Sequence, residues 1–315
     1  MTRLSDQDIE AIAQKIALDL RGPAPAKSAA PSSASAPSPA PSFEPGLGIF
    51  ATINEAVSAA QKAFPVFTAL PLAVRGKIIA AIRQCMAENA SALAKAAWEE
   101  TKLGRFEDKI IKNQLVIEKT PGIEDLYPAS FTGDHGLTLV EPAPYGVIGA
   151  ITPTTNPTST IICNTIGMLA AGNTVVFNVH PSAKNCSIQT VALINKAVIA
   201  AGGPPNAVAC MAHPTVESAQ EMMKHPGIRL LVVTGGGGVV VAAMQSGKRA
   251  ICAGPGNPPV VVDETANIDQ AARDIVLGAS FDNNIICVEE KEVIVVASVA
   301  DALLKAMSQH GAALI

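Results

Sequence analysis

Short apolar runs alternate with helical segments through the middle of the chain, and this alternation limits the fold more than any other feature. The clearest runs are GVIGAIT, TVVFNV, AVACMA and RLLVVT, at residues 146–152, 174–179, 207–212 and 229–234. Strands that are separated by helices form parallel sheets covered on both faces, and such sheets hold ligands at the carboxyl ends of their strands. The sequence therefore predicts an α/β fold with a doubly wound parallel sheet and a ligand site along that edge.

The first 46 residues differ in composition from the rest of the chain. Ile9, Ile12 and Ile16 recur at helical spacing, which predicts a short amphipathic helix within residues 1–21. The Pro/Ala/Ser-rich residues 22–46 predict a disordered, extended linker. A tethered helix has no core of its own, so its apolar stripe docks either on the body of this protein or in a groove of a partner.

The bulk composition excludes several classes of function. With 49% apolar and 16% charged residues, the 315-residue chain can build a large core. Its net charge of -4 and 3% aromatic content argue against a nucleic-acid partner. No stretch approaches the roughly 18 to 20 uncharged apolar residues that cross a bilayer, and no secretory signal opens the chain. We therefore expect a cytoplasmic protein with no membrane partner.

Three segments near strand ends carry candidate chemistry. Asn156, before Pro157, is either the N-cap of a helix or a donor to a developing oxyanion. The glycines of TGGGG, residues 234–238, give either a flexible turn or a backbone that approaches a pyrophosphate. Cys287 is either a buried structural thiol or a nucleophile, and residues 289–292 after it are expected to form a solvated charged face. The six cysteines occur singly, so we expect reduced thiols and no metal site.

Taken together, these segments resemble the aldehyde dehydrogenase superfamily, and within it the CoA-acylating propionaldehyde and acetaldehyde dehydrogenases of bacterial microcompartments. The resemblance spans nearly all of residues 47–315. It implies a nicotinamide-cofactor domain at residues 47–250 and the first part of an α/β catalytic domain at residues 251–315. The segments that carry it are GIFATINEAVSAAQKAF, PYGVIGAITPTTNPT, MLAAGNTVVFNVHPSAK, VVTGGGG, GPGNPPVVVDETANID and SFDNNIICVEEKEVIVV.

The resemblance assigns roles to particular residues. It makes Cys287 the nucleophile and Asn156 the oxyanion donor. The remaining residues that it assigns bind the cofactor, namely Thr152, Pro153, Thr154, His180, Thr234, Gly235 and Gly236. Many relatives carry KPAE, whose lysine and glutamate hold the adenosine ribose, where this chain has residues 180–183. The ribose contacts therefore differ, and the cofactor is either NAD or NADP. His180 is alternatively a turn residue before Pro181.

The resemblance also implies the acyl acceptor. Hydrolytic relatives carry a glutamate that activates water, whereas this chain has Cys252 at or next to that place. We therefore expect coenzyme A as the acceptor, and a short aldehyde, acetaldehyde or propionaldehyde, as the substrate. Two alternatives remain: a hydrolytic aldehyde dehydrogenase, and an inactive cargo or docking subunit.

The two ends of the chain complete these expectations. Family members often bear a targeting helix on a Pro/Ala linker, which implies that residues 1–20 bind microcompartment shell proteins and that the protein resides in the microcompartment lumen. Family members also continue well beyond residue 315, so we expect a C-terminally truncated chain. An arm near residues 133–143 is expected to make the full-length protein a homo-oligomer.

Overall fold

The computed structural model describes residues 44–314. The expected helix within residues 1–21 and most of the linker at 22–46 lie outside the described residues. Within the described part, no helix is both long and apolar enough to cross a membrane.

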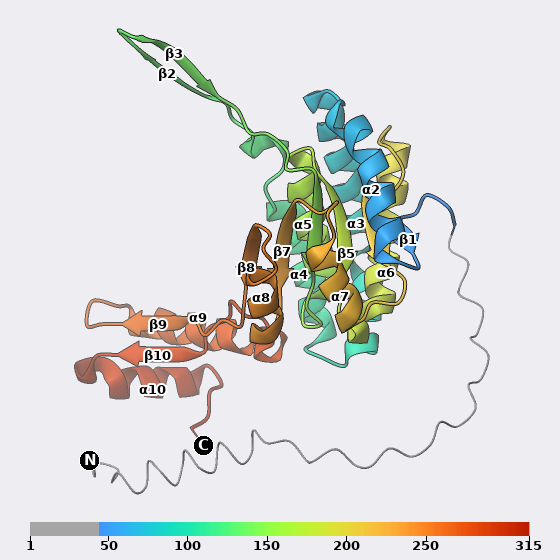
Figure 1. The fold of residues 1–315 in the computed structure, drawn as a ribbon. Coiled ribbons are helices and arrows are strands. Elements are labelled where there is room, and N and C mark those ends of the chain that lie inside the picture. The colour runs from blue at the N-terminus through green and yellow to red at the C-terminus, as the bar shows by residue number, and fades with distance from the viewer. Residues whose placement is uncertain (1–43, 315) are drawn as a thin grey trace, which may run out of the picture. The chain divides into compact units, whose positions relative to one another are not determined.

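A six-stranded parallel sheet lies at the centre of the described region (Figure 1). Neighbouring strands pair in parallel throughout, in the order β1-β6-β5-β4-β7-β8. Because β4 lies between β5 and β7, the direction of winding changes at β4, and such switch points open a crevice for ligands. The expected doubly wound sheet is confirmed. The strands are β1 (Ile49–Phe50), β4 (Val147–Ile151), β5 (Thr174–Asn178), β6 (Val208–Met211), β7 (Leu230–Thr234) and β8 (Ala250–Ala253).

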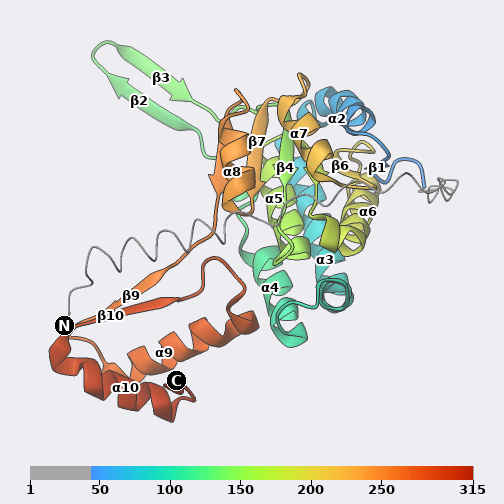
Figure 2. The same ribbon diagram turned by 60° about the horizontal axis from the view of Figure 1, so that its bottom comes forward.

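Helices cover both faces of this sheet (Figure 2). Side chains alternate between the two faces of a strand, and in β4 Val147 and Ile151 join one buried cluster while Ile148 and Ala150 join another. The first cluster is shared with α2 (Ile53–Thr68), α7 (Val216–Lys224) and α8 (Gly237–Met244). The second is shared with α3 (Leu72–Thr101), α5 (Pro157–Ala170) and α6 (Lys184–Ala200).

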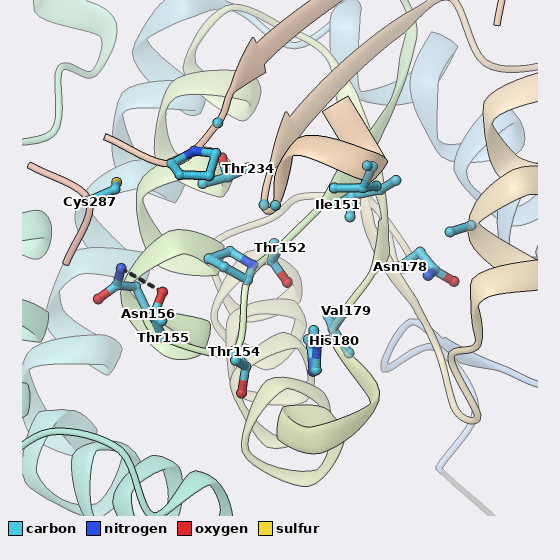
Figure 3. A pocket seen from close by; sticks show the side chains of 18 of the residues that line it. Ile151, Thr152, Thr154, Thr155, Asn156, Asn178, Val179, His180, Thr234 and Cys287 are labelled. Atoms are coloured by element: carbon cyan, nitrogen blue, oxygen red, sulfur yellow. Dashed lines mark hydrogen bonds between the residues drawn. The ribbon is translucent and has the colours of Figure 1, made fainter. Parts of the chain in front are cut away.

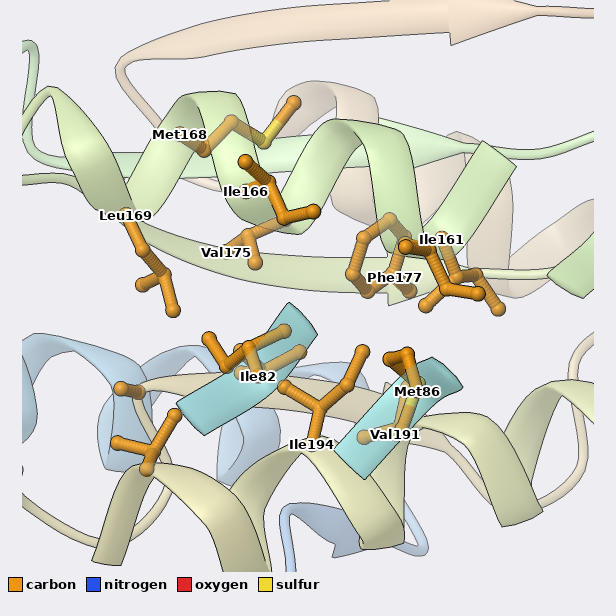
Figure 4. Close-up of a cluster of buried hydrophobic side chains, with 14 of the residues drawn as sticks. Ile82, Met86, Ile161, Ile166, Met168, Leu169, Val175, Phe177, Val191 and Ile194 are labelled. Atoms are coloured by element: carbon orange, nitrogen blue, oxygen red, sulfur yellow. The ribbon is translucent and has the colours of Figure 1, made fainter. Parts of the chain in front are cut away.

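The larger of these clusters fixes the positions of α5 and β5 (Figure 4). Ile161 and Leu169 of α5 and Phe177 of β5 are fully buried against Ile82 of α3 and Ile194 of α6. Each such side chain contributes roughly 1.5 to 3 kcal/mol by leaving water. The loops at the carboxyl ends of β4 and β5 therefore start from fixed points.

The N-terminus of α2 has the capping residues that its sequence indicates, but the sequence pattern did not predict the strand before it. Thr52 and Glu55 form a capping box, with the Thr52 hydroxyl accepting from the Glu55 N–H and the Glu55 carboxylate accepting from the Thr52 N–H. From residue 47 the sequence pattern predicts several helices before any strand, and this prediction is wrong, because β1 precedes α2 and pairs with β6 at the sheet edge. With two residues, β1 is too short to show a periodic pattern.

An antiparallel hairpin projects away from the sheet (Figure 1). It consists of β2 (Ala129–Gly133) and β3 (Gly136–Val140), and Phe131, Leu137 and Leu139 are exposed on it. The segment 133–143, expected as an arm, contains β3, whereas β2 begins earlier in the chain. The hairpin is preceded by α4 (Phe106–Lys119) and the short η1 (Ile123–Asp125).

A small α/β unit follows β8. Its strands β9 (Pro259–Val262) and β10 (Glu292–Val295) pair in parallel, and α9 (Ile268–Ser280) and α10 (Ala300–Gln309) pack together. The short helices η3 (Phe281–Asn284) and η4 (Ala297–Val299) connect these elements. Five buried residues form its core: Val262, Ala272, Ile275, Leu303 and Ala306.

Candidate active site

A cavity of about 720 Å³ lies at the carboxyl ends of β4, β5 and β7 (Figure 3). Its walls come from the loops after these strands, from α7 and α8, from residues 254–256 and 284–287, and from Lys291. The structure brings all the residues assigned from the sequence to this one cavity: Thr152, Pro153, Thr154, Asn156, His180, Thr234, Gly235, Gly236 and Cys287.

Cys287 lies in a turn whose backbone is held from several sides. The preceding residues Asp282, Asn283 and Asn284 all have positive φ, a conformation that Asn and Asp tolerate better than most residues. The side-chain NH₂ of Asn284 donates to the carbonyl of Ala279 at 2.7 Å and to that of Glu290 at 3.1 Å. Cys287 itself is partly exposed and lines the cavity, as a nucleophile requires and as a sealed structural thiol does not.

Two further contacts secure this turn. The Lys291 ammonium donates to the carbonyls of Asn284 and Ile286, each at 3.2 Å. The backbone of Gly256 packs so closely on the turn that a Cβ there would overlap the carbonyl oxygen of Cys287. The position of the thiol is therefore set by the backbone on one side and by a lysine on the other.

Asn156 occupies the N-cap position of α5, but its side chain does not cap the helix. Its carbonyl accepts the N–H of Thr160 at 3.0 Å, while its side-chain oxygen accepts from the Lys112 ammonium at 2.7 Å. The interpretation of its side chain as a helix cap is therefore wrong. Its amide NH₂ donates to the Thr155 hydroxyl at 3.1 Å and is turned toward Cys287 (Figure 3).

The turn after β7 leaves room for a phosphate-bearing ligand. Thr234 ends the strand, Gly236 is the N-cap of α8, and a Cβ at Gly236, Gly237 or Gly238 would meet no atom within 4 Å. The start of α8 therefore presents unshielded N–H groups, which favour anions. Among the described residues that line the cavity, none is Asp or Glu, so phosphates meet no like charge there.

An unpaired hydroxyl gives a second sign of a ligand site. Thr152 is 2% exposed, and its hydroxyl has no hydrogen-bond partner among residues 44–314. Buried polar groups normally find a partner, so a ligand group is expected to supply one. His180 has a local role, since its Nδ1 accepts the N–H of Ser182 at 3.2 Å and closes the turn before η2 (Pro181–Ala183). These residues fit a nicotinamide dinucleotide.

One expectation about the segment after Cys287 is wrong. Glu289 was expected in a solvated face, but it is 6% exposed, whereas the apolar Val288 is 74% exposed. The Glu289 carboxylate accepts the N–H of Ile286 at 3.0 Å, which turns it inward. Burial raises the pKa of Glu289, against the opposing effects of that hydrogen bond and of Lys291 and Lys112.

Sequence reasoning missed the buried ionic group formed by Lys109, Lys112 and Asp282. Lys112 and Asp282 are 170 residues apart in the chain, so no local pattern links them. The only available signal was the spacing of three between the two lysines, which places them on one face of a helix.

Comparisons with known proteins agree with the fold. The sequence model of the Aldehyde dehydrogenase family matches residues 48–314. The chain belongs to the aldehyde dehydrogenase family. It is 49% identical over 307 residues to an acetaldehyde dehydrogenase (acetylating) of Bilophila wadsworthia, covering 97% of this chain and 62% of that protein.

Two solved structures are also similar. One is a propionaldehyde dehydrogenase from the Clostridium phytofermentans fucose utilisation bacterial microcompartment, with 53% identity, TM-score 0.80, and coverage of 83% of this chain and 60% of that one. The other is a Rhodopseudomonas palustris propionaldehyde dehydrogenase with bound CoA and an acylated cysteine, with 51% identity, TM-score 0.81, and coverage of 84% and 61%. The chain thus spans about 60% of the length of these relatives.

Proposed function

We propose that this chain oxidises a short aldehyde, acetaldehyde or propionaldehyde, to the corresponding acyl-CoA. One observation carries the proposal: Cys287 and Asn156 line the same cavity, and the glycine turn after β7 lines it too. The names of the relatives support it, since they are acetylating acetaldehyde and propionaldehyde dehydrogenases.

The chemistry starts at the thiol. The Cys287 thiolate attacks the aldehyde carbon, and the oxygen of the resulting hemithioacetal accepts from the Asn156 NH₂ and from backbone N–H groups of the turn. A nicotinamide cofactor supplies the hydride acceptor when it is bound at the cavity. The thioester left on Cys287 is then attacked by the thiol of coenzyme A, which releases acyl-CoA and frees the cysteine.

The cavity lining favours CoA over water as the acceptor. Water needs a base to deprotonate it, and no carboxylate is present among the described lining residues. Cys252, at or next to the place of the glutamate of hydrolytic relatives, does not line the cavity, and neither does Glu289. A thiol is a good nucleophile and needs less help than water.

Product analysis tests this function. The purified chain is incubated with propionaldehyde and NAD, with and without CoA, and NADP is compared as the hydride acceptor. We expect propionyl-CoA and CoA-dependent formation of reduced cofactor, which Cys287→Ala abolishes and Cys252→Ala retains. Rapid release of free propionate without CoA would contradict the proposal and favour hydrolysis. We propose NAD as the cofactor. Faster turnover with NADP than with NAD would instead identify NADP as the cofactor.

We further propose that residues 1–20 direct the protein to a microcompartment by binding shell proteins. The apolar stripe of Ile9, Ile12 and Ile16 and the microcompartment origin of a similar structure support this. In shell-forming cells, the chain fused to a fluorescent protein should form puncta with the shell, and Ile12→Glu plus Ile16→Glu should disperse them. Diffuse fluorescence of the unmutated fusion would refute the proposal.

The β2–β3 hairpin is proposed as the arm through which copies associate. Its exposed Phe131, Leu137 and Leu139 would be covered by a second copy, and its unpaired strand edges would gain partners. Sedimentation of the chain should show an oligomer that Leu137→Asp plus Leu139→Asp dissociates. An unchanged sedimentation coefficient in that variant would show that the hairpin is not part of the interface.

A further inference from the structure

Lys112 joins the two parts of the candidate active site. It lies on α4 and is 7% exposed. Its ammonium donates to the Asn156 side-chain oxygen at 2.7 Å and to the carboxylate of Asp282, five positions before the nucleophile. A third, longer contact reaches the carbonyl of Thr155 at 3.5 Å. One side chain therefore contacts both the oxyanion donor and the segment that precedes Cys287.

The contact with Asn156 decides which end of the amide faces the cavity. The two ends of an Asn side chain have nearly the same shape, so packing alone hardly distinguishes them. An ammonium has three donors and no acceptor, and it therefore requires the oxygen end. The NH₂ end is left to face Thr155 and Cys287, as in Figure 3. In the opposite orientation, an oxygen would face the developing oxyanion and repel it.

The ammonium of Lys112 is itself held in place by a buried carboxylate. Asp282 is fully buried and accepts from the backbone N–H of Arg105 at 2.7 Å and from the Lys109 ammonium at 3.3 Å. The carboxylate of Asp108 in turn accepts the backbone N–H of Asp282 at 2.8 Å. The ionic group therefore ties the start of α4 to η3 and leaves Lys112 little freedom to turn away from Asn156.

The charge of Lys112 is sensitive to pH near neutrality. Burial and the nearby Lys109 ammonium lower the pKa of Lys112 to about 8, against the opposing effects of Asp282 and Glu289. The charged groups that act on it are Lys109 on α4, Asp282 in η3, and Glu289 beyond Cys287. Arg105 and Asp108, at the start of α4, pair with each other and contact Asp282. Above that pH, the neutral amine has a lone pair that can accept, and it no longer forces the oxygen of Asn156 to face it.

We propose that Lys112 is a positioning residue that holds the Asn156 amide with its NH₂ toward the oxygen on the carbon bound at Cys287. The inference rests on the proposed function, in which a carbonyl oxygen becomes an anion at that place. It predicts that Lys112 affects reactions that form an oxyanion and leaves other reactions of the same thiol unchanged.

Two reactions of Cys287 separate these effects, both followed by mass spectrometry of the Cys287 peptide. With p-nitrophenyl acetate, the thiolate attacks the ester carbon, an oxyanion forms, and p-nitrophenolate leaves as the S-acetyl bond is made. With iodoacetamide, the thiolate displaces iodide directly and no oxyanion forms. Both rates depend on the thiolate in the same way, so their ratio reports on oxyanion stabilisation.

We expect Lys112→Met to lower the acetylation rate about 10- to 100-fold, since loss of one oxyanion donor costs about 10² to 10³ in rate. The alkylation rate should stay within about twofold. Lys109→Met is the matched control, because it also removes one ammonium from Asp282 but has no contact with Asn156. Its two rates should both stay near those of the wild type.

The pH dependence provides a second readout. In the wild type, the ratio of acetylation to alkylation should fall as pH rises through about 8. In Lys112→Met, the ratio should be low and independent of pH. Lys112→Arg keeps a permanently charged donor, so its ratio should stay high and flat between about pH 7 and 9. This variant decides the question even if Lys112→Met does not fold, which thermal melting would show.

Several results would overturn the inference. These are wild-type acetylation in Lys112→Met, an equal fall of acetylation and alkylation, and a double variant with Asn156→Ala that is clearly slower than Asn156→Ala alone. A wild-type chain that is alkylated but not acetylated at Cys287 would also overturn it. Failure of the proposed function looks different, since the acetylation defect of Lys112→Met would persist while no CoA-dependent cofactor reduction occurs.

Discussion

Residues 287–289 show how one turn can reverse the solvent exposure expected from side-chain polarity. Val288 points outward, and Glu289 lies inside with its carboxylate on the N–H of Ile286. A charged side chain is seldom buried unless it is paired, so a sequence window would always suggest the opposite arrangement. The reversal follows from the backbone of the turn, whose Ile286 N–H holds the Glu289 carboxylate inside.

At this scale, we predict that Glu289→Gln makes the protein relatively more stable as pH rises. Burial raises the folded-state pKa of Glu289 above its unfolded value near 4.3, so its contribution to stability is greatest below that pH and declines as pH rises through the folded pKa. Glutamine keeps an acceptor for Ile286 and does not ionise. Urea unfolding at pH 5 and pH 7 should show a larger gain for the variant at pH 7.

Glu264→Gln serves as the control, because Glu264 is exposed in the same C-terminal part of the chain. Its stability relative to wild type should be the same at both pH values. A Glu289→Gln gain that did not grow with pH would show that the folded state accommodates the ionised carboxylate without cost.

Among the elements, the loop of residues 254–256 shows how two neighbouring glycines can differ in consequence. A Cβ on Gly256 would overlap the carbonyl of Cys287, whereas a Cβ on Gly254 would meet only the Val240 side chain at 3.9 Å. We predict that Gly256→Ala slows acetylation of Cys287 by at least about tenfold, because small displacements of a reacting group are costly.

The same substitution should also lower the melting temperature, in line with a cost of about 1 to 3 kcal/mol for forcing extra atoms into a packed site. Gly254→Ala should leave melting and acetylation of Cys287 near those of the wild type. Equal behaviour of the two variants would mean that the 254–256 loop moves freely and does not hold the nucleophile turn.

The start of α6 depends on a capping residue from a different helix. Glu100 of α3 accepts the N–H groups of Asn185 and Cys186 at 2.9 and 2.8 Å. We predict that Glu100→Ala lowers the free energy of unfolding by about 1 to 2 kcal/mol, as for other lost caps.

The adjacent Glu99 gives a matched comparison, since it makes only an exposed ion pair with Lys95 at 3.9 Å. Glu99→Ala should cost less than about 0.5 kcal/mol. Denaturant unfolding of both variants measures the difference. If the two losses were equal, the contact of Glu100 with α6 would not stabilise the fold.

Sequence patterns predicted the elements with a strong period and missed those without one. β4, β5, β6 and β7 are apolar runs between helices, and the parallel sheet followed from them. β1 was missed because two residues carry no period, and β2 because ASFTG is fully exposed and weakly apolar. The cavity could be located from strand ends, but Lys112 and Asp282 could not, because only the folded chain brings α4 to η3.

Across the whole described region, stability should be unevenly distributed. All residues of β4 and β5 are buried, whereas in β9 and β10 exposed residues such as Val261 and Ile294 occur in each strand. The small unit that contains β9 and β10 also has a much smaller core than the sheet. It should therefore open more readily than the sheet.

We predict that backbone amides of β4 and β5 exchange with deuterium at least about a hundredfold more slowly than those of β9 and β10, since local opening free energies range from near zero to the global value. Hydrogen exchange followed by mass spectrometry measures this difference. Equal protection in the two regions would show that the small unit and the sheet unfold together.

The ionic group between α4 and η3 also has a consequence for protein engineering. Chimeras are usually built by exchanging contiguous segments, and residues 251–314 look like a natural segment to exchange. Asp282 would then be separated from the Lys109 and Lys112 with which it pairs across more than 150 positions. A transplanted segment would bring a buried carboxylate without its cations, or leave two ammonium groups without their anion. Grafts that carry residues 105–112 together with the exchanged segment should therefore yield soluble chimeras more often than grafts of the segment alone.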